Sequence, residues 1–124
     1  MQPINHHRRT IGLFLLLTVA IFACSIVPTA EPPGVGEKAE RGYTTCAPII
    51  TALEQYLLDK GEYPESLTGL VPDYLAQVPG EVNDQPISYT KTEEGFSLSF
   101  HYIGPGMNTC TYTPANEWSC SGAY

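Results

Sequence analysis

The sequence predicts an α+β fold in which one amphipathic helix packs on a small antiparallel sheet. Three observations predict it. Apolar residues recur at helical spacing from residue 49 to 60, and they alternate with polar residues from 87 to 102. The C-terminal segment carries Cys110 and Cys120 where a hairpin would place them side by side. With 124 residues, fewer after processing, the chain is expected to form a single small domain.

The N-terminus has the composition of an export or anchoring segment. Its first ten residues are basic, and Ile11–Val27 contains no charge. The run Ile21–Cys24 ends in a small residue and a cysteine. It resembles the bacterial lipobox, which predicts that the thiol of Cys24 is lipidated and that Cys24 becomes the new N-terminus. An uncleaved membrane anchor and ordinary secretion are the alternatives. All three place the domain outside the cytoplasm, in the periplasm or at the cell surface.

These features divide the chain into a signal or anchor segment over residues 1–23, a tether over 24–36 and a globular domain over 37–124. Pro28–Gly36 lacks apolar periodicity and helix formers, which is typical of a tether. If Cys24 begins the mature chain, four cations remain against thirteen acids, a net charge of −9. Such a domain should repel nucleic acid. The predicted partners are therefore the membrane, through the N-terminal segment, and envelope or secretion-system proteins.

The helix is predicted from residue 49 onward. At about 100° per residue, five apolar side chains share one face. They are Ile49, Ile50, Leu53, Tyr56 and Leu57. Gly61 supplies the left-handed residue that ends the helix. Pro48 leaves the start open. The helix begins near Thr45 with Pro48 in its first turn, or it begins near Glu37 and kinks at Pro48, which adds Tyr43 and Cys46 to the apolar face.

The segment between the helix and the strands is expected to contain only short elements. Residues 62–66 should form a turn, and residues 67–79 short helical turns interrupted by Pro72 and Pro79. Residues 80–85 are expected to be a loop with Asn83-Asp84 at its tip.

Two strands are predicted over residues 87–92 and 96–102, joined by Glu93-Glu94-Gly95. Partners whose numbers sum to 189 set Tyr89 opposite Phe100 and Ile87 opposite Tyr102, so that both apolar sets share one face. A sum of 188 would set serine and threonine against them. We expect the former, with a turn of two or four residues.

The C-terminal tail predicts a second hairpin, with strands over residues 109–113 and 117–120 around the three-residue loop Pro114-Ala115-Asn116. Partners then sum to 230, so Cys110 lies opposite Cys120 and Tyr112 lies opposite Trp118. Directly opposed residues have Cα atoms about 4.5–5.5 Å apart, a separation that a disulfide spans. Because the compartment is oxidising, we expect a Cys110–Cys120 disulfide. A metal pair would need further ligands, and the mature chain has one histidine.

The residues expected at the centre of the core come from both layers. They are Ile50, Leu53, Leu57, Tyr89, Phe100 and Trp118. Cys46 is expected to be a buried small hydrophobe rather than a reactive thiol.

No sequence motif argues for an enzyme. There is no glycine-rich phosphate loop, zinc-ligand spacing or G-x-S-x-G elbow. Ser99 and His101 share a strand face, but an orienting acid and an oxyanion site are not indicated, and the wet face of a half-buried strand is the simpler interpretation. Asn83 and Asp84 suit a weak calcium site, although the acids are better explained by solubility. We expect no catalytic residue, no metal and no cofactor.

The helix and first hairpin resemble the pilin-like major pseudopilins of type II secretion systems. The shared pattern covers roughly residues 45–100: a helix ending in ALE-x-Y, a G-x-YP-x-x-L turn, YL-x-x-VP, P-x-x-Y and a GF-x-L strand. The matching residues are Ala52–Tyr56, Gly61–Pro64, Leu67, Leu70, Pro72, Tyr74, Leu75, Val78, Pro79, Pro86, Tyr89 and Gly95–Leu98. The resemblance implies a pilin-like globular fold, and the disulfide hairpin is similar to the analogous loop of many type IV pilins.

The chain departs from that family at its N-terminus. A prepilin peptidase site has a glycine before the apolar segment and glutamate at the segment's fifth position. Here Gly12 is followed by Leu13–Leu17, with leucine at the fifth position. Pro28–Gly36 interrupts the continuous helix that filaments pack together, and the disulfide hairpin replaces the family's calcium-binding loop. No metal residue is therefore carried over.

The favoured hypothesis is a non-enzymatic, membrane-tethered envelope lipoprotein with a pseudopilin-like domain and a structural or protein-interaction role. The first alternative is a minor pseudopilin of a type II secretion or type IV pilus-like machine, processed after Gly12. The second alternative is a small periplasmic ligand-binding or inhibitor module that uses the tyrosine-rich surface.

Overall fold

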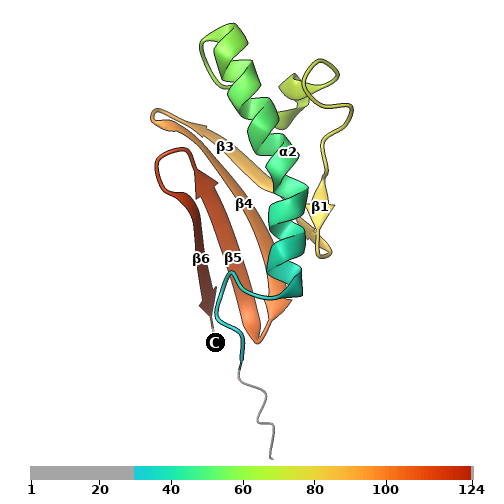
Figure 1. The fold of residues 1–124 in the computed structure, drawn as a ribbon, viewed down its shortest axis with the longest axis vertical. Helices are drawn as coiled ribbons and strands as arrows, with labels where there is room; N and C mark the ends of the chain where they lie inside the picture. Colours follow the sequence, from blue (N-terminus) through green and yellow to red (C-terminus); the bar gives the residue numbers. More distant parts are fainter. Residues whose placement is uncertain (1–29, 124) are drawn as a thin grey trace, which may run out of the picture.

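Residues 30–123 are described by a computed structural model, and they form an α+β fold with one α-helix (Figure 1). In chain order the elements are α2 (Glu37–Lys60), η2 (Leu67–Leu70), β1 (Glu81–Val82), β2 (Gln85–Pro86), β3 (Ser88–Thr92), β4 (Gly95–Gly104), β5 (Gly106–Thr113) and β6 (Glu117–Ala123). Strands β3 to β6 form one antiparallel sheet in which each strand pairs with the next along the chain. The predicted α+β class, a helix with antiparallel strands and a C-terminal disulfide hairpin, is confirmed.

Helix α2 begins at Glu37, so the longer of the two predicted helices is the one that forms. Pro48 lies in its interior at an exposed position. Gly61 ends the helix with a φ of 79°, and its amide donates to the Leu57 carbonyl at 2.8 Å, as the C-terminal signal predicted. The additional N-terminal turns bring Cys46 into the core, where its side chain is fully buried.

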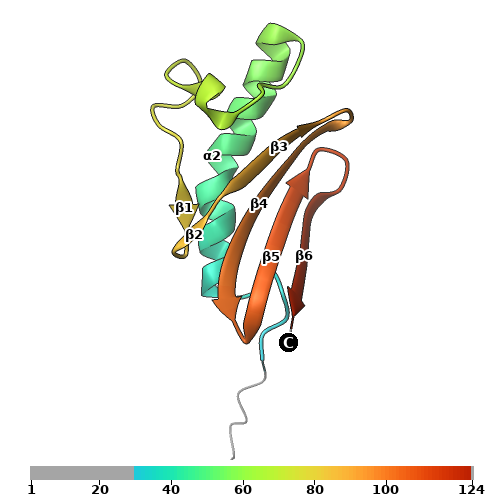
Figure 2. The ribbon, with the colours of Figure 1, turned by 180° about the vertical axis from the view of Figure 1, so that it is seen from behind.

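Helix α2 lies across one face of the four-stranded sheet, and no described element covers the opposite face (Figures 1 and 2). Strand β4 supplies much of the sheet surface that packs on α2. Its residues alternate between buried and more exposed positions along most of its length. Its buried side chains, Phe96, Leu98, Phe100 and Tyr102, lie on the helix side. The buried core consists of Ala39, Cys46, Ile49, Ala52, Leu53, Leu70, Val82, Phe96, Leu98, Phe100, Tyr102 and Cys110.

The six residues expected at the core centre lie at different depths. Leu53 and Phe100 are fully buried. Three are half-buried and pack against the core, namely Ile50, Tyr89 and Trp118. Leu57 is half-buried but is not part of this cluster, and it lines a surface hollow together with Lys91 and Gly95 at the β3–β4 end of the sheet.

The predicted register of the first hairpin is wrong by two residues. Tyr89 pairs with Leu98 rather than Phe100, and Thr92 pairs with Gly95, so the partners sum to 187. The turn is therefore the two residues Glu93 and Glu94. A shift of two keeps every side chain on its expected face, so apolar alternation alone does not distinguish the two registers.

Ile87 also differs from the prediction, because it lies just before β3 and its amide donates to the Gly80 carbonyl at 3.1 Å. Tyr102, its expected partner, lies beyond the last β3–β4 pair, which is Ser88 with Ser99.

The second hairpin has the predicted register. Cys110 pairs with Cys120, Tyr112 pairs with Trp118, and a disulfide of 2.03 Å joins the two sulfurs. Both strands are longer than expected, since β5 begins at Gly106 and β6 continues to Ala123. Strand β5 begins this early because the turn from β4 is tight, with Gly104 paired to Gly106. Strand β6 continues to Ala123 because it pairs with the start of β5 at Met107.

The segment expected to be a loop over residues 80–85 folds into the β1–β2 hairpin. Its two-residue tip is Asn83-Asp84, as predicted, and both residues have positive φ (54° and 59°), as this kind of turn requires. The tip is held against α2, because the Asn83 amide donates to the Lys38 carbonyl at 2.8 Å. The hairpin thereby covers one side of the helix and buries Val82.

Gly42 allows α2 to approach β4 closely. A Cβ at this position would overlap the ring of Phe100. The same ring makes edge contacts with Tyr43 of α2 and Trp118 of β6, at centroid distances of 5.4 and 5.3 Å. One side chain of β4 therefore packs on both the helix and the disulfide hairpin.

Opening the disulfide should destabilise the domain. Replacing Cys110 and Cys120 together with alanine is expected to lower the free energy of unfolding by ~2–3 kcal/mol, because the bond closes a loop with a sequence separation of 10. Urea unfolding followed by Trp118 fluorescence measures the change. Wild-type protein unfolded with a reductant serves as the control and should lose a similar amount. Equal stability of the oxidised wild type and the double variant would contradict the prediction.

Gly42→Ala should also destabilise the domain. The added methyl group overpacks the contact with Phe100, at a cost of ~1–3 kcal/mol, and this outweighs the gain in helix propensity of about 1 kcal/mol. Gly80→Ala is the matched control, because no heavy atom lies within 4 Å of a Cβ there, and its unfolding free energy should change by less than about 0.5 kcal/mol. The prediction fails if Gly42→Ala is as stable as the wild type in thermal unfolding.

Candidate interaction surfaces

The chain that precedes α2 is fastened to the sheet. The Gly34 amide donates to the Tyr102 hydroxyl at 2.9 Å, and the Tyr43 hydroxyl donates to the Gly34 carbonyl at 3.0 Å. Gly34 has a φ of 85°, and a Cβ there would lie 2.8 Å from the sulfur of Cys120, so this close approach requires glycine. Residues near Gly34, expected to be tether, thus belong to the packed structure.

Tyr43 connects this segment to the disulfide. Its hydroxyl oxygen lies 3.1 Å from the sulfur of Cys120 and 3.8 Å from that of Cys110. Burial, followed by the nearby Tyr102 and Glu40, raises the pKa of Tyr43, which keeps the hydroxyl protonated and able to donate. The sequence placed Tyr43 on the apolar face of the longer helix, but it carried no signal for these polar contacts.

The outward positions on the uncovered face of the four-stranded sheet are occupied mainly by serine and threonine. Every Ser and Thr after residue 70 occupies an outward position of the observed register. They are Ser88, Thr90, Thr92, Ser97, Ser99, Thr109, Thr111, Thr113, Ser119 and Ser121. Glu117 is the one carboxylate at the outward positions of these described strands, so the face is broad, polar and almost without formal charge.

Ser99 and His101 lie on this face, as the strand pattern predicted, but each bonds to the neighbouring strand. The Ser99 and Thr111 hydroxyl oxygens are 2.8 Å apart, and Nδ1 of His101 lies 2.9 Å from the Thr109 hydroxyl oxygen. Both pairs are directly opposed in the β4–β5 register. The two residues therefore serve as cross-strand partners in this arrangement, and no nucleophile–base hydrogen bond joins them.

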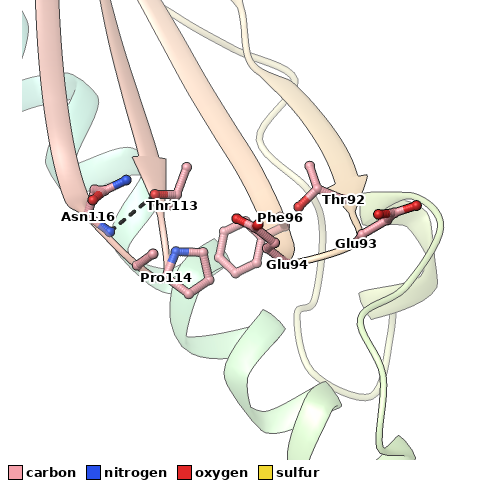
Figure 3. Close-up of a pocket in the computed structure, with 8 residues that line it drawn as sticks. Thr92, Glu93, Glu94, Phe96, Thr113, Pro114 and Asn116 are labelled. Carbon is pink, nitrogen blue, oxygen red and sulfur yellow. Dashed lines mark hydrogen bonds between the residues drawn. The ribbon is translucent and has the colours of Figure 1, made fainter.

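A hollow of about 420 Å³ lies between the β3–β4 turn and the β5–β6 loop (Figure 3). The side chains of Glu93 and Glu94 stand on one side, and Pro114 and Asn116 stand on the other. The Phe96 ring also lines it. The described residues contain no group of three or more His, Cys, Asp or Glu side chains that could hold a metal ion.

Polar contacts also fix the loop that follows α2. Lys91 of β3 forms ion pairs with Glu65 at 2.7 Å and Glu62 at 2.9 Å. The hydrogen bonds that the Lys91 ammonium donates to Glu65 and then to Glu62 raise the pKa of Lys91. The Tyr89 hydroxyl donates to the Pro64 carbonyl at 2.7 Å, and burial raises the pKa of Tyr89 to about 12. These contacts hold the loop that follows α2 against strand β3.

The four cysteines have different environments. Cys24, the expected lipidation site, lies outside the described residues, whereas Cys110 and Cys120 are bonded to each other. Cys46 is free and fully buried among apolar side chains. Burial raises the pKa of its thiol to about 11.

Taken together, the fold and these surfaces define a small disulfide-clipped α+β domain with packed side chains, a hydroxyl-rich sheet face and a fastened N-terminal segment. Comparison with protein families, curated proteins and solved structures finds no match. Among the residues that the structure describes, no helix is long and apolar enough to cross a membrane.

Cys46 should not react with thiol reagents in the folded protein. In a Cys24→Ala variant with the disulfide intact, Cys46 is the only thiol. At pH 8 the higher pKa reduces the thiolate on the order of 100-fold relative to an ordinary cysteine, and burial blocks access as well. An aromatic disulfide reagent should label less than one tenth of the protein before unfolding, by order of magnitude. It should label about one thiol per chain in urea, and rapid labelling of the native protein would contradict the prediction.

Proposed function

We propose that this protein is a non-enzymatic, membrane-tethered envelope lipoprotein whose pilin-like domain has a structural or protein-interaction role. The single observation that carries the proposal is a disulfide-clipped domain on a chain that begins with a basic and apolar leader. Disulfides persist in oxidising compartments, and a leader of this composition directs export. The lipid attachment at Cys24 is inferred from Ile21–Cys24, which resembles a lipobox.

The architecture supports the pilin-like part of the proposal. A single amphipathic helix packs across an antiparallel sheet, and the hairpin that ends the described chain is closed by a disulfide. The sequence pattern shared with pseudopilins falls on the last turns of α2, the loop that follows it, and strands β3 and β4.

The start of α2 supports a tethered domain over a filament subunit. The helix begins at Glu37, after a Gly36 N-cap with a φ of 96°, and the preceding chain turns and docks at Gly34. A pseudopilin packs into a filament through one long helix that continues from its apolar segment. Here the chain from residue 30 to 36 is not helical, so such a helix does not run through this point.

The hydroxyl-rich face is the surface proposed for contact with envelope partners. It is the face of the four-stranded sheet that no element of residues 30–123 covers (Figure 2). The scarcity of charge on it contrasts with the acidic chain as a whole, so this face avoids the repulsion that the remaining surface would exert on acidic partners.

Intact mass of the protein extracted from membranes tests the lipoprotein assignment. The expected species begins at Cys24 and carries a diacylglyceryl group, and Cys24→Ala should abolish this modification. Ser25→Ala is the matched control, because it changes the adjacent residue and leaves the thiol in place. A chain that begins at an N-methylated Leu13 would contradict the proposal and identify a minor pseudopilin. A chain that begins near residue 24 without lipid would indicate ordinary secretion.

A further inference from the structure

Exposed apolar side chains gather at one end of the domain. Five large hydrophobic residues are substantially exposed in the described part of the chain. Three of them lie close to the β4–β5 turn: Ile103 and Met107, each 57% exposed, and Val35, 50% exposed. The other two are Leu58 and Val71.

The β4–β5 turn forms an apolar tip. Ile103 and Met107 are directly opposed in the register and occupy outward positions, and the three residues between them are Gly104, Pro105 and Gly106. This five-residue stretch contains no charge. Its backbone is held in place, since Nζ of Lys38 donates to the Ile103 carbonyl.

Val35 lies on the other side of the same turn. Together with Gly104 and Pro105 it lines a hollow of about 250 Å³. The turn and Val35 therefore lie at the same end of the domain, with Val35 on one side of the turn and Ile103 and Met107 on the other. We define residues 103–107 and Val35 together as the apolar tip.

The apolar tip lies at the end of the domain from which the chain leads toward the N-terminal apolar segment. Residues 30–36 and the β4–β5 turn share this end in both views (Figures 1 and 2). Only two residues separate Val27 from Ala30, a reach of at most about 11 Å. Counted from Cys24 instead, the reach to Ala30 is about 22 Å at most. Either form of anchor holds this end of the domain near the membrane.

We propose that the apolar tip is a second membrane contact, in which Ile103, Met107 and Val35 enter the interface of an uncharged lipid bilayer. The inference rests on the proposed function, because it requires an anchored chain. Contact by so few side chains is weak in free solution, but the anchor converts it to an intramolecular event at high effective concentration.

A bilayer fits this surface better than a second copy of the chain does. Stable protein interfaces bury about 1,200–2,000 Å² in total, which three side chains do not approach. Insertion into a lipid interface needs only a small apolar projection with the polar body left in water. Glu31, Glu37 and Lys38 lie beside the tip, so its surroundings carry two acids against one cation, and the chain is acidic overall. An uncharged head group therefore suits the tip better than an anionic one.

Tryptophan placed at the tip tests the contact in the full-length, membrane-anchored protein. Met107→Trp reports on the tip, and Glu94→Trp is the matched control in the β3–β4 turn at the opposite end (Figure 1). The wild type carries Trp118 alone, so its signal is the common background. Each protein is reconstituted in phosphatidylcholine vesicles, with and without lipid brominated near the head-group end of the acyl chains. Flotation verifies attachment, and circular dichroism verifies folding.

Met107→Trp should be quenched by the brominated lipid at least about twofold more than Glu94→Trp or the wild type, because an interfacial group lies about 5–10 Å into the boundary. Ile103→Trp provides a second probe if Met107→Trp fails to fold. Equal quenching of tip and control variants on floating vesicles overturns the inference and leaves the proposed function intact. A Met107→Trp chain that floats but is shielded from both lipid and aqueous quencher also overturns it, because that tip contacts protein. Absence of flotation overturns the proposed function.

Discussion

The fold depends on the close packing of Phe100 against Gly42. Because glycine leaves room for the ring, α2 lies near enough to β4 for Cys46, Ile49 and Leu53 to be sealed from water. The same ring contacts Tyr43 and Trp118, so the position of the helix also sets the position of the C-terminal hairpin. A larger helix residue at that point would separate the layers, and the disulfide would then clip a hairpin with little to pack on.

The parts of the fold that could be predicted are those in which the local sequence is compatible with only one arrangement. Helical periodicity and Gly61 located the helix and its end, and alternation located the buried face of β4. The C-terminal register was also predictable, since a three-residue loop brings Cys110 and Cys120 opposite each other. In the first hairpin the same reasoning did not select one register, because two registers that differ by two residues place every side chain on the same face. In the observed register Thr92 pairs with Gly95, and the alternation of apolar residues does not distinguish this pairing from its alternative.

The surfaces were harder to predict because they depend on contacts between distant segments. Gly34 looked like part of a flexible, proline-rich tether, yet it bonds to Tyr102, 68 residues away. Asn83 is at the predicted tip, but the hydrogen bond by which it holds a small hairpin against α2 left no signal in the sequence. The hydroxyl-rich face was present in the alternation of β3 and β4, but its extent became clear only when all four strands were in register. The paired hydroxyls of Ser99 and Thr111 belong to that arrangement, which no single strand reveals.

The docking of Gly34 has a mechanical consequence. Tension applied along the chain from the N-terminal side would reach this glycine before it reaches α2. The load would pass through its two hydrogen bonds to Tyr102 of β4 and Tyr43 of α2, and so divide between both layers. The neighbouring cystine prevents β5 and β6 from peeling apart beneath that point. The domain can thus bear a pull from its attachment without that pull first unwinding the helix.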